Sequence, residues 1–352
     1  MRKQETQTQK SPESAKGCPS REDASRRTLL VFNCYEAWVY QLGVLGYNLD
    51  IIIGLKGRYK PTWDEQMRPV PPNSRLITLQ EAQQSQTNYY CIITHNITDL
   101  LDVKRRHEPR LTVLHLPIEA RLVEEKSDIE PEKMKEVLHK YMKLVGGHVV
   151  AVSMLKGKSW GFTEDIVPFG SDPDDYLPYS GQIASGLRIS NFIQMRKQFL
   201  LWDFYEKAFD GIPVRIVGHN PDMLRVRAAN SWDHLKRTLQ SHRFYIHTAN
   251  PELEDGYNMA TVEAMAAGMP VLGNRHPTSP IEHGVSGFLS DDPAELRKYA
   301  GMLLEDKILA TMMGKEARKT AIERFSMTGF KEAFLRSIET ARRKWKKRKL
   351  NR

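Results

Sequence analysis

The sequence predicts an α/β protein made of two doubly wound domains, each with a parallel sheet covered by helices. Three observations predict it. Short apolar runs typical of buried strands alternate with helical patterns along most of the chain, as in β-α-β units. A length of 352 residues suits two domains of ordinary size. A segment containing Ser, Gly and Pro, 178–186, separates two such series of elements and predicts a linker.

The composition indicates a globular chain, with 40% hydrophobic and 27% charged residues. No apolar run is long enough to span a membrane, and no apolar segment follows the N-terminal charges. We therefore expect neither a membrane span nor a secretory signal, and a cytoplasmic location. Cys18, Cys34 and Cys91 are widely spaced. This spacing predicts reduced thiols, with neither a disulfide framework nor a zinc site.

The net charge of +9 is concentrated at the two ends of the chain. Residues 342–352 hold eight Lys or Arg and no acid, and residues 1–27 hold seven bases against four acids. The body is close to neutral, so a basic face for nucleic acid is not predicted. The basic tail, which includes Trp345, is suited to peripheral contact with an anionic membrane surface such as the inner membrane. A tail that is simply solvated explains the same residues equally well. Residues 1–27 are too polar to bury a core and predict a disordered leader.

The first domain is expected over residues 28–177. A strand over 28–33, a helix over 34–45 and a strand over 49–54 form a β-α-β opening, which predicts a right-handed crossover. The dinucleotide fingerprint Gly-x-Gly-x-x-Gly is absent. Two later predicted strands end at His95 and His115. Ligands of such sheets bind at the carboxyl ends of strands, so both histidines are candidate site residues.

The second domain is expected over residues 187–329, and its central stretch 255–274 reads as a loop, a helix and a strand. The loop enters the helix N-terminus, where unpaired N–H groups and the positive dipole end suit a phosphate. Asp255 and Glu263 frame that end. The pattern suggests a nucleotide-sugar site, with an ordinary helix carrying exposed acids as the alternative. Further along, 284–289 reads as a hairpin.

The spacing Asp255-x7-Glu263, followed by Ala-Met-Ala-Ala-Gly-Met-Pro-Val, resembles the signature of the retaining GT-B glycosyltransferases, especially family 4, the group 1 glycosyl transferases. The resemblance implies a GT-B fold, in which two Rossmann-like domains face a central cleft. Residues 28–177 are then the acceptor domain, 187–329 the nucleotide-sugar donor domain, and 330–352 a C-terminal helix with a basic tail. Glu254 directly precedes Asp255, and either acid can take the place of the family's first Glu.

The resemblance also implies the residues of the site. Glu263 is expected to accept hydrogen bonds from ribose hydroxyls, and Asp255 or Glu254 to act at the transferred sugar. Asn191 stands where the family has an Arg, so one cation of the family's site is missing. Arg188 or Lys197 could supply that cation instead. The expected donor-binding residues are Asn191, Arg196, Lys197, Gly218, Gly256, Tyr257, Asn258, Met259 and Glu263.

His95 resembles the histidine that the family places beside the donor sugar, and is expected to be catalytic together with Asp255 or Glu254. A loop histidine bonded to backbone is the alternative. Asp172-x-Asp174 matches the metal-binding pattern of the other major glycosyltransferase fold only superficially. Because Pro and Asp are turn residues, this segment predicts a turn and no metal ligand.

The expected function is transfer of a sugar from a nucleoside-diphosphate sugar to a polysaccharide or lipid-linked acceptor, with retention of configuration. The acceptor would enter from the first domain near residues 34–38 and Glu119. The resemblance implies no cofactor and no obligatory metal. Two alternatives stay open: glycosylation of modified nucleic-acid bases, and a catalytically silent GT-B protein that binds a nucleotide sugar.

Overall fold

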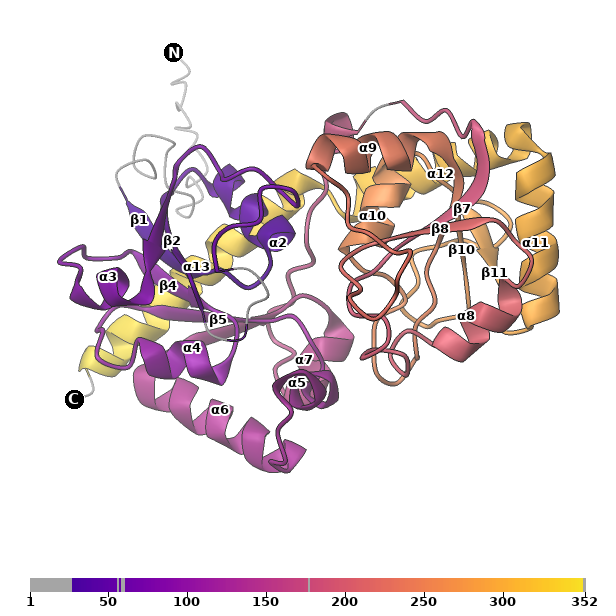
Figure 1. The fold of residues 1–352 in the computed structure, drawn as a ribbon. Helices are drawn as coiled ribbons and strands as arrows, with labels where there is room; N and C mark the ends of the chain where they lie inside the picture. The colour runs from indigo at the N-terminus through magenta and orange to yellow at the C-terminus, as the bar shows by residue number, and fades with distance from the viewer. Residues whose placement is uncertain (1–26, 56, 58–60, 177, 351–352) are drawn as a thin grey trace, which may run out of the picture.

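The computed structural model describes residues 27–55, 57, 61–176 and 178–350, which form two α/β domains side by side (Figure 1). Most of the expected leader, residues 1–26, and the last two residues of the tail lie outside the described residues. Both sheets are parallel and carry helices, so the predicted fold class is confirmed.

The first domain is built on a six-stranded sheet in the order β3-β2-β1-β4-β5-β6. This is the strand order of a doubly wound Rossmann-like domain. Its strands are β1 (Thr28–Phe32), β2 (Asn48–Ile53), β3 (Ser74–Thr78), β4 (Cys91–Thr94), β5 (Arg110–Leu114) and β6 (His148–Ala151). Its helices are α2 (Glu36–Tyr40), α3 (Leu79–Gln84), α4 (Ile97–Asp102), α5 (Ile118–Glu125), α6 (Pro131–Val145) and α7 (Met154–Trp160).

The expected helix over 34–45 is shorter than predicted. It divides into α2 and a 3-10 turn, η1 (Gln41–Leu45), which ends at Gly46 with φ 83°. Gly43 inside the segment weakens an α-helix. A Cβ on Gly43 would lie 3.3 Å from Pro71 Cβ, so the tighter turn brings the backbone close to that loop.

The predicted turn after Asp172 is confirmed. The Asp172 side chain accepts a hydrogen bond from the Asp174 amide at 3.0 Å. This contact caps the short 3-10 helix η2 (Pro173–Asp175). The residue types favoured in turns have therefore set the local structure here.

The second domain has a five-stranded parallel sheet in the order β11-β10-β9-β7-β8. Its strands are β7 (Ile183–Ile189), β8 (Val214–Val217), β9 (His242–Ile246), β10 (Val271–Gly273) and β11 (Gly287–Leu289). Its helices are α8 (Trp202–Ala208), α9 (Trp232–Ser241), α10 (Met259–Ala266), α11 (Pro293–Glu305) and α12 (Lys307–Arg324).

Two expectations in this domain are wrong. β7 begins at Ile183, so the last residues of the expected linker 178–186 belong to the sheet. The hairpin expected over 284–289 is instead a turn leading to β11, which pairs in parallel with β10. A Cβ on Gly287 would lie 1.9 Å from Val271 O, so only glycine permits this approach of the two strands.

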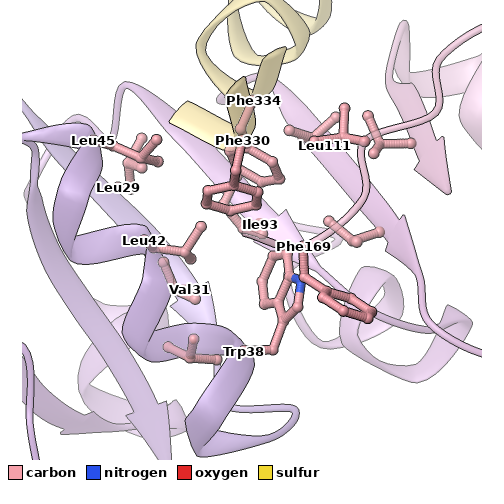
Figure 2. Close-up of a cluster of buried hydrophobic side chains, with 14 of the residues drawn as sticks. Leu29, Val31, Trp38, Leu42, Leu45, Ile93, Leu111, Phe169, Phe330 and Phe334 are labelled. Carbon is pink, nitrogen blue, oxygen red and sulfur yellow. The ribbon is translucent and has the colours of Figure 1, made fainter. Parts of the chain in front are cut away.

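The last helix, α13 (Met327–Leu350), returns to the first domain. Figure 2 shows Phe330 and Phe334 of α13 among side chains from the first sheet and α2. Phe334 is fully buried, and its ring centroid lies 5.7 Å from that of Trp38. Among the described helices, α13 included, none combines the length and apolarity needed to cross a membrane.

Candidate donor site at the amino end of α10

Three acids of the second domain surround the amino end of α10. Glu254, Asp255 and Glu263 have relative exposures of 5%, 1% and 7%. A carboxylate is rarely buried unless a cation or hydrogen-bond donors compensate for the lost water. The groups that pair with these three acids therefore define the site.

The amino end of α10 is fixed by a reciprocal cap. Asn258 Oδ1 accepts a hydrogen bond from the Thr261 amide at 2.9 Å, and Thr261 Oγ1 accepts one from the Asn258 amide at 3.3 Å. The amides of Met259 and Ala260 begin the helix and have no intrahelical acceptor. They lie at the positive end of the helix dipole. This end of α10 is thus held rigidly with donors available to an anion.

Two histidines hold the loop that contains the acids. His247 Nε2 lies 3.2 Å from Asp255 O, and His276 Nε2 lies 3.0 Å from Glu254 O. The Gly256 amide donates to Thr278 Oγ1 at 2.8 Å. A Cβ on Gly256 would lie 2.7 Å from the His276 ring, so the loop needs glycine at this position. The backbone of the loop is therefore fixed from two neighbouring strand ends.

We expect protonation of His247 to weaken the fold. Burial lowers the pKa of His247 from 6.5 to about 4. In the unfolded chain this histidine gains a proton below about pH 6.5, whereas in the folded protein it stays neutral until about pH 4. The contribution of neutral His247 to the free energy of unfolding is therefore complete above pH 6.5 and is lost as the pH falls. Between pH 7.5 and 5.0 the difference amounts to about 2 kcal/mol.

Urea unfolding of wild type and His247→Gln at both pH values measures this contribution. Gln can still donate to the Asp255 carbonyl but does not titrate. The free energy of unfolding should fall less on acidification in the variant than in wild type. An equal fall in both proteins would mean that His247 does not carry the effect.

A lysine of the first domain joins two of the acids. Lys156 Nζ lies 3.1 Å from Glu254 Oε1 and 3.0 Å from Asp255 Oδ2. Ser153 caps α7 and places Lys156 in its first turn, where the side chain is buried. Burial alone would lower the pKa of Lys156, but Glu254 and Asp255 raise it above its ordinary value. The pair is ionic and connects the two domains.

The acids 254 and 255 differ in what remains available to a ligand. Glu254 Oε2 also pairs with Arg196 Nη2 at 2.9 Å, so both of its oxygens face cations. These cations hold the pKa of Glu254 below its usual range, although burial opposes them. Asp255 Oδ1 is buried and has no hydrogen-bond partner among the described residues. Asp255 thus presents an acceptor that a bound hydroxyl can satisfy.

Glu263 is engaged by the first domain as well. Its Oε1 accepts a hydrogen bond from Arg68 Nη2. The Arg68 guanidinium also lies 4.5 Å from the Trp232 ring centroid, on α9. Burial raises the pKa of Glu263, and Arg68 opposes that shift. The acid expected to meet the ribose therefore has an interdomain ion pair in this structure.

The expected diphosphate residues lie at the carboxyl ends of β7 and β8. Asn191 Oδ1 accepts from the His219 amide at 2.8 Å, so it holds the Gly218 turn. A Cβ on Gly218 would lie 2.1 Å from Ser190 O, and its φ is 149°. Arg196 is half-buried beside Glu254, and Lys197 is exposed. Arg196 therefore joins the acid cluster, whereas Lys197 is not placed there.

Arg188 does not reach the site. Its guanidinium donates to Thr248 Oγ1 at 2.8 Å and to Leu200 O at 3.4 Å. It also lies 4.5 Å from the Tyr205 ring centroid. Burial lowers the pKa of Arg188 to about 10. This arginine is a core residue of the second domain, so the cation that Asn191 lacks is not supplied by Arg188.

Two predicted donor residues take part in contacts with the first domain. The Tyr257 ring packs between Phe169 and Phe325, with centroids 5.8 and 5.2 Å away. Met259 Sδ lies 4.0 Å from Gln41 Nε2 of η1. The backbone of both residues remains at the amino end of α10, where amides can face a ligand.

His95 lies at the end of β4 in the first domain and is 2% exposed. Its Nε2 contacts Phe32 O at 2.9 Å, and its Nδ1 contacts His115 Nε2 at 2.9 Å. The backbone contact matches the alternative reading of this histidine. Direct proton transfer by His95 would require one of these contacts to be released.

Sequence reasoning missed Lys156 and Arg68. Neither stands in a motif, and each acts on an acid about 100 residues or more further along the chain. Ser153 signals the start of α7, but the face that α7 presents to the other domain depends on how the domains dock. No local pattern could identify these two cations.

Residues 207–306 match the family described as glycosyl transferases group 1. Similar solved structures include HepE from Anabaena in complex with UDP and glucose, at a TM-score of 0.65 and 16% identity, over 87% of this chain and 97% of that one. This protein has the GT-B fold, and residues 207–306 match the group 1 glycosyl transferase model. The resemblance to GT-B glycosyltransferases that was read from the sequence is confirmed.

Other GT-B relatives agree with this assignment. Sucrose-phosphate synthase from Thermosynechococcus elongatus superposes with a TM-score of 0.61 at 14% identity, over 87% of this chain and 96% of that one. N-acetyl-alpha-D-glucosaminyl L-malate synthase of Bacillus anthracis is 34% identical over 76 residues, which are 20% of each chain. The aligned segment thus spans about a fifth of this curated relative. The family match over residues 207–306 includes α10.

Proposed function

We propose that this GT-B protein transfers a sugar from a nucleoside-diphosphate sugar to a glycan or lipid-linked acceptor. One observation carries the proposal. Asp255 holds an unpartnered buried carboxylate oxygen at the amino end of α10, and its other oxygen pairs with Lys156 of the first domain. Solved relatives of this fold support the donor class, since HepE was crystallised with UDP and glucose.

The leaving diphosphate gains negative charge as the glycosidic bond breaks. The amides of Met259 and Ala260 and the dipole of α10 stabilise that charge without reorganising. Arg196 adds a cation that can bind a phosphate bidentately. Lys156 adds another from the first domain, which offsets the absence of an arginine at Asn191. With these groups present, transfer has no obligatory metal at the diphosphate and needs no cofactor.

Asp255 acts at the transferred sugar, through its unpartnered Oδ1. It accepts a sugar hydroxyl or stabilises the positive charge that develops on the ring. Glu254 holds Lys156 and Arg196 in place and acts through them as a positioning residue. Retention of configuration follows the family that the sequence resembles.

Glu263 accepts the ribose hydroxyls once Arg68 withdraws. A carboxylate can accept several hydrogen bonds, so a ribose can replace or share the arginine. Because Arg68 belongs to the first domain, donor binding and domain opening are coupled at this residue. The Arg68→Gln protein should therefore bind a donor more tightly than wild type does. Weaker donor binding in this variant would mean that Arg68 assists the ribose contact.

Screening UDP-, GDP- and ADP-sugars by thermal shift, followed by assay of sugar release and transfer, tests the proposal. A donor at a hundred times its dissociation constant stabilises the native state by about 2.7 kcal/mol. We expect one nucleotide class to raise the melting temperature and to be consumed. Binding without any consumption would favour the silent GT-B alternative. No stabilisation by any class would overturn the proposal.

The basic end of α13 is proposed to bring the enzyme to an anionic membrane surface. Lys346, Lys347 and Lys349 are exposed there, and Leu350 is 86% exposed. Trp345 Nε1 donates to His107 O at 2.6 Å, so the helix end is fixed to the first domain. A lipid-linked acceptor would be presented at such a surface.

Replacing these three lysines with Gln should weaken binding to phosphatidylglycerol vesicles roughly a hundredfold, because each contributes about 1 kcal/mol. Neutral phosphatidylcholine vesicles are the control, and sedimentation measures the bound fraction. Unchanged vesicle binding would remove the membrane role. Loss of duplex DNA binding instead would favour the nucleic-acid alternative.

A further inference from the structure

Three potential metal ligands of the first domain converge at the carboxyl edge of its sheet. Cys34 follows β1, His95 follows β4 and His115 follows β5, and these strands are neighbours in the sheet. One donor atom from each residue lies within 4.8 Å of the others. We propose that Cys34 Sγ, His95 Nδ1 and His115 Nε2 form a binding site for a zinc-type transition-metal ion.

The distances are close to those of a tetrahedral zinc site. Zn–S and Zn–N bonds of ordinary length at tetrahedral angles place sulfur and nitrogen about 3.5 Å apart and two nitrogens about 3.3 Å apart. Cys34 Sγ lies 3.6 Å from His115 Nε2, and His115 Nε2 lies 2.9 Å from His95 Nδ1. To admit the ion, the two rings need to separate by about 0.4 Å, and Cys34 Sγ and His95 Nδ1, which lie within 4.8 Å of each other, need to reach about 3.5 Å.

The surroundings orient the ligands. His95 Nε2 lies 2.9 Å from Phe32 O, which accepts its proton and leaves the Nδ1 lone pair directed at the cluster. A backbone carbonyl behind a histidine is the usual outer contact of a metal ligand. Trp38 is 2% exposed and packs edge-on against both histidine rings, with centroids 5.2 and 4.7 Å away.

A fourth position is available beside the two histidines. A cavity of about 10 Å³ is lined by both rings, by Thr112 and by Arg121. That volume holds about one water molecule. Three protein ligands and one water are the composition of an open zinc site. The structure therefore has room for about one water molecule beside the two histidines.

The chemistry of the ligands selects the ion. One thiolate and two imidazoles favour zinc and related transition metals over magnesium or calcium, which prefer oxygen ligands. Binding releases the Cys34 thiol proton to solvent and moves the His115 proton from Nε2 to Nδ1. The site belongs to the first domain and is independent of the diphosphate contacts.

Cobalt substitution tests the site directly. The chain has three cysteines. In a Cys18→Ser, Cys91→Ala background, Cys34 is the sole thiol, so a thiolate-to-cobalt charge-transfer band reports Cys34 alone. We expect one Co²⁺ per chain with this band, displaced by one equivalent of Zn²⁺. Adding Cys34→Ser should abolish the band. His115→Gln should weaken Co²⁺ binding at least tenfold, and the control His107→Gln should leave it unchanged.

Two results would overturn the proposal. One is a folded background protein, checked by circular dichroism, that binds no Co²⁺ with a charge-transfer band. The other is a band that persists after Cys34→Ser. The first result does not depend on whether the Cys34→Ser protein folds, because it is measured on the Cys18→Ser, Cys91→Ala protein alone.

Discussion

Asp255→Asn is expected to lower the rate of sugar transfer roughly a hundredfold, the cost of losing one preorganised charge at a reacting centre. The amide keeps the size of the side chain but removes the charge beside the sugar. Donor affinity should change far less, because the proposed contacts of the diphosphate lie on α10, Arg196 and Lys156, none of which is replaced. Steady-state assays with saturating donor measure the loss as a fall in kcat.

Two matched variants make this result specific. Glu252→Gln neutralises an exposed acid in the same loop and should leave kcat unchanged. Glu254→Gln removes the acid whose oxygens both face cations, so it should disturb donor binding and stability as well as turnover. If Asp255→Asn keeps transfer within a few-fold of wild type, Asp255 is not the acid at the sugar.

Lys156→Met is expected to cost about 3 kcal/mol or more of the free energy of unfolding, the usual effect of removing one partner of a buried ion pair. Glu254 keeps Arg196, but Asp255 loses the cation at its Oδ2. The carboxylate then regains water only if the two domains separate. The variant should therefore show a lower urea midpoint and a larger radius of gyration by small-angle X-ray scattering.

The control for Lys156→Met is a second lysine of α7, and the rescue replaces Asp255, the acid that loses its partner. Lys158→Met changes an exposed lysine of α7 and should alter stability by less than about 0.5 kcal/mol. Adding Asp255→Asn to Lys156→Met removes the unpaired charge and should restore part of the lost stability. A Lys156→Met protein as stable and compact as wild type would show that the pair does not hold the domains together.

Much of the candidate donor site follows from the sequence because its signals are local. Gly256, Asn258 and the spacing from Asp255 to Glu263 lie within one loop and one helix, and the structure places all of them at the amino end of α10. The reading of Gly284 and Gly287 as a hairpin failed for a tertiary reason. Gly287 is needed where β11 approaches β10, and nothing local reveals that contact.

The expectation of no zinc site rested on local spacing, since no two cysteines are close along the chain. Cys34, His95 and His115 meet only because β1, β4 and β5 are neighbours in the sheet. Sequence reasoning placed both histidines at the carboxyl edge of the sheet. The sequence alone did not reveal the strand order that places the Cys34 thiol beside these two histidines.

By itself the sequence determined the two doubly wound domains, the phosphate-ready end of α10 and the acids around it, because periodicity, capping and turn residues act over a few positions. Only the tertiary structure decided which cations meet those acids. Lys156 and Arg68 reach Asp255 and Glu263 across the domain boundary, and a buried carboxylate must be paired wherever the docked surfaces supply a charge.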